Sequence, residues 1–220
     1  MLRATHQDVG LKLRLNLFEG VAAPDVYGAL TAFYAKRGAA LAAEPDRWRR
    51  YELHHRQGRW CVLDWDGGWE WKQRREAQLF VSMQLHTTGL LVFAFDGEYW
   101  GYELLRDGEV VDRFLQNPSA GATWFPGDPC DGNASVLARE LGLSEHGLAP
   151  YLVQQPTDSD PDQADWRELD LPARSGDEFG RFHECAVVDF LRAIGVQVEV
   201  SQGYVRMRSE VWRSFRPRFG

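Results

Sequence analysis

The residues of this sequence whose types and spacing are best suited to binding chemistry are the aromatic side chains around position 65. Residues 64–71 read DWDGGWEW, and a second aromatic group, YWGY, occupies residues 99–102. Paired glycines beside aspartates permit an unusual backbone conformation, and the start of the following helix favours a binding concavity. Exposed aromatic rings and arginines would bind a sugar, a base or a partner protein. This pattern gives as candidate binding residues Trp65, Asp66, Trp69, Trp71, Arg75, Tyr99 and Trp100.

A second interpretation assigns the same aromatic residues to the core of the protein. Trp60 and Trp100 would then be buried in strands, while Trp69 and Trp71 pack the start of a helix onto the sheet. Alternation with period two already accounts for half of these positions, so the core interpretation is the favoured one.

Histidines and carboxylates offer a weaker indication of a metal site. His54 and His55 are adjacent, so on a strand they point to opposite faces and cannot bind one ion together. Either histidine with Asp64 or Asp66 across a hairpin is geometrically feasible, but a solvent-facing histidine near carboxylates is the favoured interpretation. The acidic stretch 158–169 begins like a calcium-binding loop, yet it lacks the required glycine and the final glutamate. The sequence therefore predicts no metal site.

Recognised catalytic motifs do not occur in the sequence. Neither the nucleophile motif G-x-S-x-G nor a glycine-rich phosphate-binding motif is present. Cys130 is flanked by Asp128 and Asp131, whose negative charges would raise the pKa of its thiol and reduce its reactivity. We therefore expect no catalytic residue and no cofactor, and a non-enzymatic protein is favoured over an enzyme.

The hydrophobic pattern predicts the strands and helices that position these residues. Residues 11–18 alternate between leucine and polar side chains, which is typical of a half-buried strand. Further strands are expected at residues 48–55, 59–64, 90–96, 99–105 and 110–115, separated in part by turn pairs such as Asp107-Gly108. Helices are expected from near Pro24 to Gly38 and over residues 69–85 and 177–194, and a short helix is expected that Asp131 or Asn133 caps and Gly142 ends. Residues 39–46 are expected to be a loose connection, and a final hairpin to span residues 196–208.

These elements predict an α+β fold. Tight turns imply antiparallel strand pairing, and the apolar stripes of the helices need a sheet face to cover. We expect a curved antiparallel sheet with helices packed on one face. Residues 1–118 form the α+β core, residues 119–178 a turn-rich segment with short helices and an acidic mobile loop, and residues 179–220 a C-terminal helix and hairpin packed on the same domain. A separate C-terminal lobe is the alternative.

Composition limits the class of protein and of partner. The chain has 220 residues and a net charge of −7, which argues against a nucleic-acid binder that uses a basic surface. A locally basic stretch, residues 206–218, is more simply explained by pairing with the acidic bulk or by solvation. Three widely spaced cysteines suit a reducing compartment, and no apolar run is long enough for a membrane span. We therefore expect a cytoplasmic protein.

The segment 75–117 resembles a group of uncharacterised bacterial proteins. The shared features are a helix ending in Ser82-Met-Gln-Leu85 and a strand meander with Tyr102, Leu104, Asp107-Gly108 and Asp112. The resemblance covers about half of the chain. It implies no established activity, but it adds Asp112 and Arg113 to the candidate binding residues. A salt bridge within the hairpin explains these two residues equally well.

Two hypotheses for the function follow. In the first, the protein is a non-enzymatic interaction module of an immunity or adaptor type, which binds another protein or a second copy of itself. An acidic surface, aromatic anchors and the missing catalytic motifs favour it. In the second, the protein binds a small molecule or carbohydrate, and could be an enzyme, in a cleft between residues 64–71 and 99–102.

Overall fold

The computed structural model describes residues 11, 13–42, 51–56, 58–65, 71–95, 99–121, 125, 127–155, 171–183, 185–201 and 204–219. Its strands are β1 (Leu13–Glu19), β2 (Ala39–Ala42), β3 (Tyr51–His54), β4 (Trp60–Trp65), β5 (Thr88–Phe95), β6 (Tyr99–Arg106), β7 (Glu109–Leu115), β8 (Val198–Ser201), β9 (Tyr204–Met207) and β10 (Val211–Phe219). Its helices are α1 (Ala23–Ala35), α2 (Trp71–Leu85), α3 (Pro118–Gly121), α4 (Ala134–Leu141), α5 (Glu145–Leu148), a 3-10 turn at Ala149–Tyr151, and α6 (Ala186–Ala193). The predicted α+β class is confirmed.

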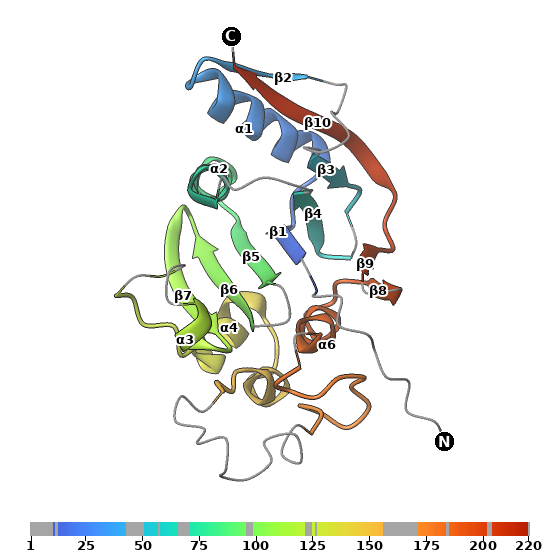
Figure 1. Cartoon of the computed structure of the whole chain (residues 1–220). Coiled ribbons are helices and arrows are strands. Elements are labelled where there is room, and N and C mark those ends of the chain that lie inside the picture. Colours follow the sequence, from blue (N-terminus) through green and yellow to red (C-terminus); the bar gives the residue numbers. More distant parts are fainter. Residues whose placement is uncertain are drawn as a thin grey trace.

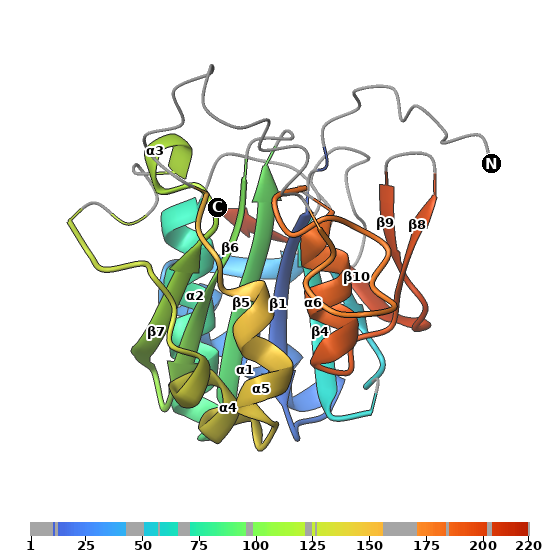
Figure 2. The ribbon, with the colours of Figure 1, turned by 90° about the horizontal axis from the view of Figure 1, so that it is seen from below.

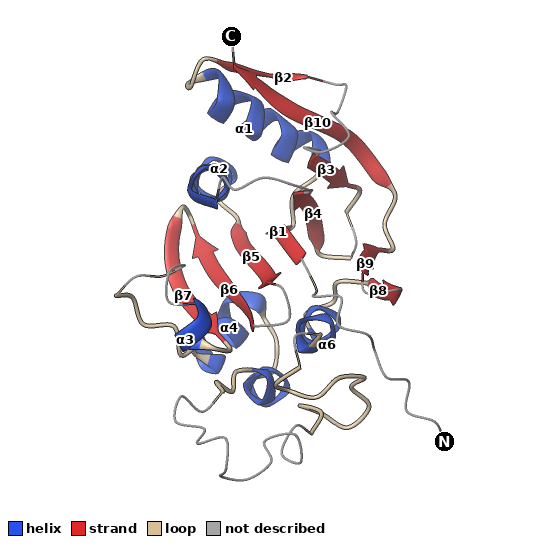
Figure 3. Cartoon of the chain, in the orientation of Figure 1, coloured by secondary structure: helices blue, strands red, loops and turns tan. Residues whose placement is uncertain are grey.

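A large antiparallel sheet organises the molecule (Figures 1 and 3). Its strand order is β2-β10-β3-β4-β1-β5-β6-β7, while β8 and β9 pair separately at one side of it (Figure 2). The predicted turn between β6 and β7 forms at Asp107 and Gly108, whose φ angles of 50° and 83° are both positive. Such angles match the twist of the flanking strands, so this pair fixes the register of the hairpin.

Helices cover both faces of the sheet, whereas one covered face was expected. Helices α1 and α2 lie on one side, and α4, α5 and α6 lie on the other (Figures 1 and 2). The reason is visible in β5 and β6, where all residues except the last of each strand are buried. A strand buried on both faces reads as a continuous apolar run rather than an alternating one. Trp60 links β4 to the helices on the second face, because its indole N–H donates to the carbonyl of Ile194, just after α6, at 2.8 Å.

The C-terminal segment differs most from the expected elements. The predicted helix over residues 177–194 is wrong at its start, because α6 comprises only Ala186–Ala193. The carboxylate of Asp189 accepts the backbone N–H groups of Glu178 and Phe179, both at 2.9 Å, which folds the preceding segment back against α6. Strand β10 was not predicted; it lies between β2 and β3 and so joins the C-terminal segment to the main sheet.

Two further expectations concern connecting segments. Part of the loose connection expected at residues 39–46 is strand β2, which pairs with β10. Most of the acidic loop expected within residues 154–178 lies outside the described residues. In the part of the chain that the structure describes, no helix combines the length and the apolar character needed to cross a membrane.

Candidate functional site

Three of the predicted binding residues are buried in the core. Trp65, Tyr99 and Trp100 are 3%, 4% and 0% exposed. Trp65 packs edge-on against Tyr51 with ring centroids 4.5 Å apart, and Trp100 packs against Phe114 at 5.0 Å. These rings therefore cannot form the exposed platform that the aromatic pattern suggested. The physical reason is that both faces of the sheet are covered. Trp100 packs in the core on the side of α4–α6, Trp65 packs in the core on the side of α1 and α2, and Tyr99 packs in a small cluster with Phe125.

The strand-to-helix junction is only partly described. Asp66 and Trp69 lie outside the described residues, and so does the side chain of Trp71, whose backbone begins α2. The binding role expected for these three residues stays a prediction.

Arg75 and Arg113 meet at a buried carboxylate that the sequence did not single out. Arg75 on α2 donates its Nε–H to both carboxylate oxygens of Glu103, at 2.9 and 2.7 Å. Arg113 donates to Glu103 Oε1 at 2.8 Å and reaches Asp128 with a second nitrogen at 3.1 Å. Glu103 is fully buried, and its hydrogen bond to Arg75 is the main cause of the raised pKa of that guanidinium. We name these four residues the Glu103 cluster.

The Glu103 cluster ties α2 to the β6–β7 hairpin. Glu103 and Arg113 are directly opposite each other in the β6–β7 register, so of the two residues that a hairpin salt bridge was expected to explain, it explains Arg113, with Glu103 as the acid. A buried ion pair whose two charges both remain satisfied is a structural contact, and breaking it leaves an uncompensated buried charge.

Asp112 points to the opposite face from Arg113 and joins a different set of contacts. Its Oδ2 accepts the hydroxyl of Tyr102 at 2.6 Å and the backbone N–H of Asn133 at 3.1 Å. Asn133, one of the two caps that the sequence allowed, in turn caps α4, because its side chain accepts the N–H of Val136. Burial raises the pKa of Asp112 above its ordinary value, against the lowering effect of these hydrogen bonds. Asp112 and Arg113 therefore do not form one site.

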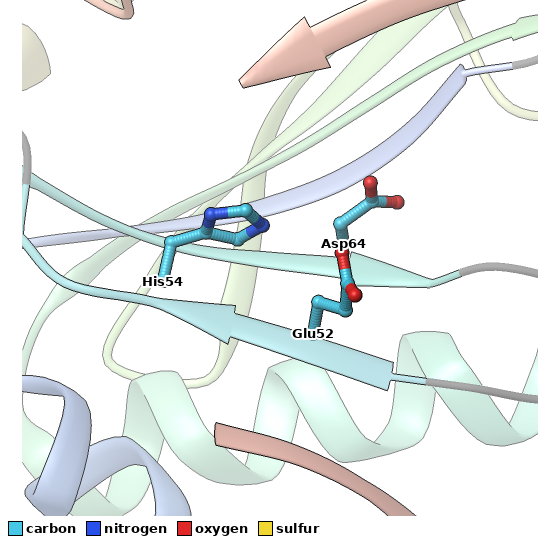
Figure 4. A group of neighbouring side chains, drawn as sticks. All are labelled: Glu52, His54 and Asp64. Carbon is cyan, nitrogen blue, oxygen red and sulfur yellow. The ribbon is translucent and has the colours of Figure 1, made fainter. Parts of the chain in front are cut away.

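Glu52, His54 and Asp64 come together on the face of the sheet opposite α1 and α2 (Figure 4). His54 with Asp64 is one of the pairs that the sequence made feasible, and Glu52 completes the group. One potential ligand atom from each side chain lies within 4.8 Å of the other two. His54 is 4% exposed, and burial lowers the pKa of its imidazole despite the raising effects of the Ser209 carbonyl and of Glu52. We name these three residues the Glu52–His54–Asp64 cluster.

A partly buried aromatic group at the surface of α1 and β10 was missed by the sequence reasoning. The guanidinium carbon of Arg213 lies 4.7 Å from the ring centroid of Tyr27 and 4.9 Å from that of Trp212. The two rings contact each other edge-on at 5.7 Å, and the neighbouring Val211 is 38% exposed. The sequence signal for this group is the triplet Val211-Trp212-Arg213, which lies within the stretch 206–218 that was interpreted only by its basic charge. We name Tyr27, Trp212 and Arg213 the Tyr27–Trp212–Arg213 patch.

A shallow groove of about 380 Å³ lies at the other end of the sheet from the predicted cleft. Its lining is polar and includes Glu19, Arg59, Arg106 and Arg139. Arg59 pairs with Glu19, Arg106 donates to the Thr88 hydroxyl at 2.9 Å, and Arg139 pairs with Glu140 at 2.8 Å, so all three arginines already have partners. The groove lacks the apolar lining that is typical of small-molecule sites.

Comparison of the chain with protein-family models, with curated proteins and with solved structures finds no match. The resemblance of residues 75–117 to a group of bacterial proteins accordingly stays a prediction. A function for this chain is therefore inferred from the chemistry of its described surface.

Proposed function

We propose that this chain is a non-enzymatic protein-interaction module whose binding surface is centred on the Tyr27–Trp212–Arg213 patch. Tryptophan, tyrosine and arginine dominate the residues that contribute most to protein–protein binding. Here all three types lie in mutual contact at the surface, and none of the three side chains is buried. This grouping is the observation that supports the proposal.

The patch is held in place before any partner arrives. Beneath it, Tyr27 packs edge-on against the buried ring of Phe215 at 5.2 Å, so both α1 and β10 contribute to its support. Rings fixed by such packing lose little conformational entropy on binding, which favours affinity. The partner would be another protein or a second copy of this chain.

Capture experiments with matched variants test the proposal. The chain with Trp212→Ala or Arg213→Ala is compared with wild type as bait in lysate of the native host. The control is Met83→Ala, which removes a 48% exposed apolar side chain on α2. We expect wild type and the control to retain a stoichiometric partner, and each patch variant to weaken its binding roughly 30-fold, as a central anchor residue does.

Two outcomes would refute the proposal. One is a partner that binds the patch variants as tightly as it binds wild type. The other is the failure of wild type both to capture a protein and to self-associate in sedimentation velocity over a range of concentrations. Unchanged melting temperatures of the variants would show that any loss of binding is local.

The alternative, a small-molecule or carbohydrate site between residues 64–71 and 99–102, has less support. Four of the aromatic rings that it requires at a surface, Trp65, Tyr99, Trp100 and Tyr102, are at most 4% exposed.

A cytoplasmic location is part of the proposal. Cys61, Cys130 and Cys185 are all free thiols, and Cys61 and Cys185 are buried as small apolar side chains. Burial raises the pKa of Cys61 to about 12, which keeps it protonated and unreactive.

A further inference from the structure

The Glu52–His54–Asp64 cluster is built by strand pairing. Glu52 and Asp64 are directly opposite each other in the β3–β4 register, and His54 follows Glu52 by two residues on β3. Successive strand residues alternate between faces, so Glu52 and His54 share one face while Tyr51 and Leu53 occupy the face of α1 and α2. Three residues thus converge through the backbone geometry of two short strands.

The imidazole of His54 is oriented by a backbone carbonyl. Its Nδ1 lies 3.3 Å from the carbonyl oxygen of Ser209, just before β10. A carbonyl can only accept, so Nδ1 carries the proton of the neutral ring and Nε2 carries the lone pair. Histidines that bind metals usually donate their other ring N–H in this manner, which fixes the tautomer and the ring orientation.

The second nitrogen of this ring is poised for a cation. Nε2 of His54 is buried and has no hydrogen-bond partner among the described residues. Figure 4 shows the outer edge of the imidazole directed toward the carboxylates of Glu52 and Asp64. A lone pair that faces carboxylates has no donor to accept from, and a buried acceptor in that position is unfavourable. A positive ion bound between the three groups would give this lone pair a partner and would be attracted by both carboxylates.

We propose that Glu52, His54 and Asp64 bind a divalent transition-metal ion such as Zn²⁺ or Mn²⁺. One imidazole nitrogen and two carboxylate oxygens suit these ions, whereas Ca²⁺ prefers six to eight oxygens and Cu⁺ prefers sulfur. In a tetrahedral site with bonds near 2.1 Å, ligand atoms lie about 3.4 Å apart. The ligand atoms, at most 4.8 Å apart, would therefore have to approach one another to about 3.4 Å, a shift that side-chain rotation can supply.

The two carboxylates are half-buried, so solvent and ions reach the cluster from their side. Three protein ligands leave at least one coordination position for water or for a group from a bound molecule. This proposal does not depend on the Tyr27–Trp212–Arg213 patch, and either one can fail without the other.

Metal titration of the purified full-length chain tests the proposal. After treatment with EDTA and removal of the chelator, the protein is titrated with ZnCl₂ and with MnCl₂ by calorimetry. We expect one site per chain. Glu52→Gln and Asp64→Asn, which keep the shape of the side chains, should each weaken binding at least tenfold. The control Glu76→Gln removes a carboxylate that pairs with Arg37 on the other side of the sheet, and it should bind as wild type does.

Nitrogen NMR of the histidine rings identifies the ligand directly. In the metal-free protein, we expect the signals of His54 to show a protonated Nδ1 and an unprotonated Nε2. Addition of Zn²⁺ should shift Nε2 alone, while the rings of His55 and His86 stay unchanged. Failure to bind either ion would overturn the proposal, and so would binding that is equally tight in wild type, Glu52→Gln and Asp64→Asn. A Zn²⁺ response in another histidine with none in His54 would also overturn it.

Discussion

Two clusters of charged residues on opposite faces of the same sheet behave differently. In the Glu103 cluster, a fully buried carboxylate receives hydrogen bonds from two guanidinium groups, and Asp128 compensates part of the remaining positive charge. In the Glu52–His54–Asp64 cluster, two half-buried carboxylates converge on a buried imidazole whose Nε2 accepts no hydrogen bond from the described residues.

This difference in charge pairing distinguishes a cluster that stabilises the fold from a cluster that could bind a cation. Each charge of the Glu103 cluster already has an opposite charge within hydrogen-bond distance, so an added ion has little to gain there. In the Glu52–His54–Asp64 cluster, the two carboxylates and the Nε2 lone pair of His54 are all acceptors, and together they attract a cation. Predicted binding residues that belong to the first kind, Arg75 and Arg113, are therefore better explained by stability than by ligand binding.

The largest expected effect is on stability when Glu103 is neutralised. Glu103→Gln keeps the shape of the side chain but leaves Arg75 and Arg113 without their buried counter-charge. We expect a loss of about 3 kcal/mol in the free energy of unfolding, measured by urea denaturation, because removing one partner of a buried ion pair typically costs about 3–5 kcal/mol. The matched control Glu76→Gln breaks a surface ion pair and should cost less than about 0.5 kcal/mol. Equal losses of stability in Glu103→Gln and Glu76→Gln would contradict the assignment of the Glu103 cluster as a buried structural contact.

An intermediate case is Asp112, a partly buried carboxylate that is satisfied by hydrogen bonds rather than by a cation. Its pKa is raised, chiefly by burial, so the folded state binds a proton more readily than the unfolded state does. The stability from this group is therefore complete below the unfolded-state pKa of about 3.9 and is lost as the pH rises through the folded-state pKa.

Asp112→Asn removes this titration while keeping an acceptor for Tyr102 and Asn133. The free energy of unfolding of wild type minus that of the variant should therefore fall as the pH rises from 4, and then level off. Urea denaturation of both proteins at steps from pH 4 to pH 7 measures it. A difference that is constant or that grows with pH would contradict the assignment.

The smallest expected effect concerns the Glu52–His54–Asp64 cluster without metal. In EDTA, Asp64→Asn should change the free energy of unfolding by less than about 0.5 kcal/mol, because the side chain is partly exposed and the substitution keeps its shape. With excess Zn²⁺, wild type should gain melting temperature and the variant should not. A large loss of stability in EDTA would show that this cluster stabilises the fold as the Glu103 cluster does, and the two clusters would no longer differ in role.

Local pattern alone determined much of the fold. The alternation of residues 11–18 predicted β1, the Asp107-Gly108 pair predicted the β6–β7 turn, and a cap at Asp131 or Asn133 predicted the start of α4. Each of these depends on residues close in sequence: the side-chain period of a strand, a left-handed turn, or a capping bond within three residues. The α+β class followed because these elements, taken together, need antiparallel pairing and a helix layer.

Contacts between distant segments decided the rest. Strand β10 joins the sheet between β2 and β3, more than 150 residues away along the chain from either, and no local signal encodes that choice. Packing on both faces of the sheet buries Trp65, Tyr99 and Trp100, which the sequence left open between surface and core. The sequence alone made the pair His54 and Asp64 feasible, but only strand register added Glu52, and only the Ser209 carbonyl oriented the ring. Register and burial arise from packing over the whole domain, whereas capping and turn formation depend on a few neighbouring residues.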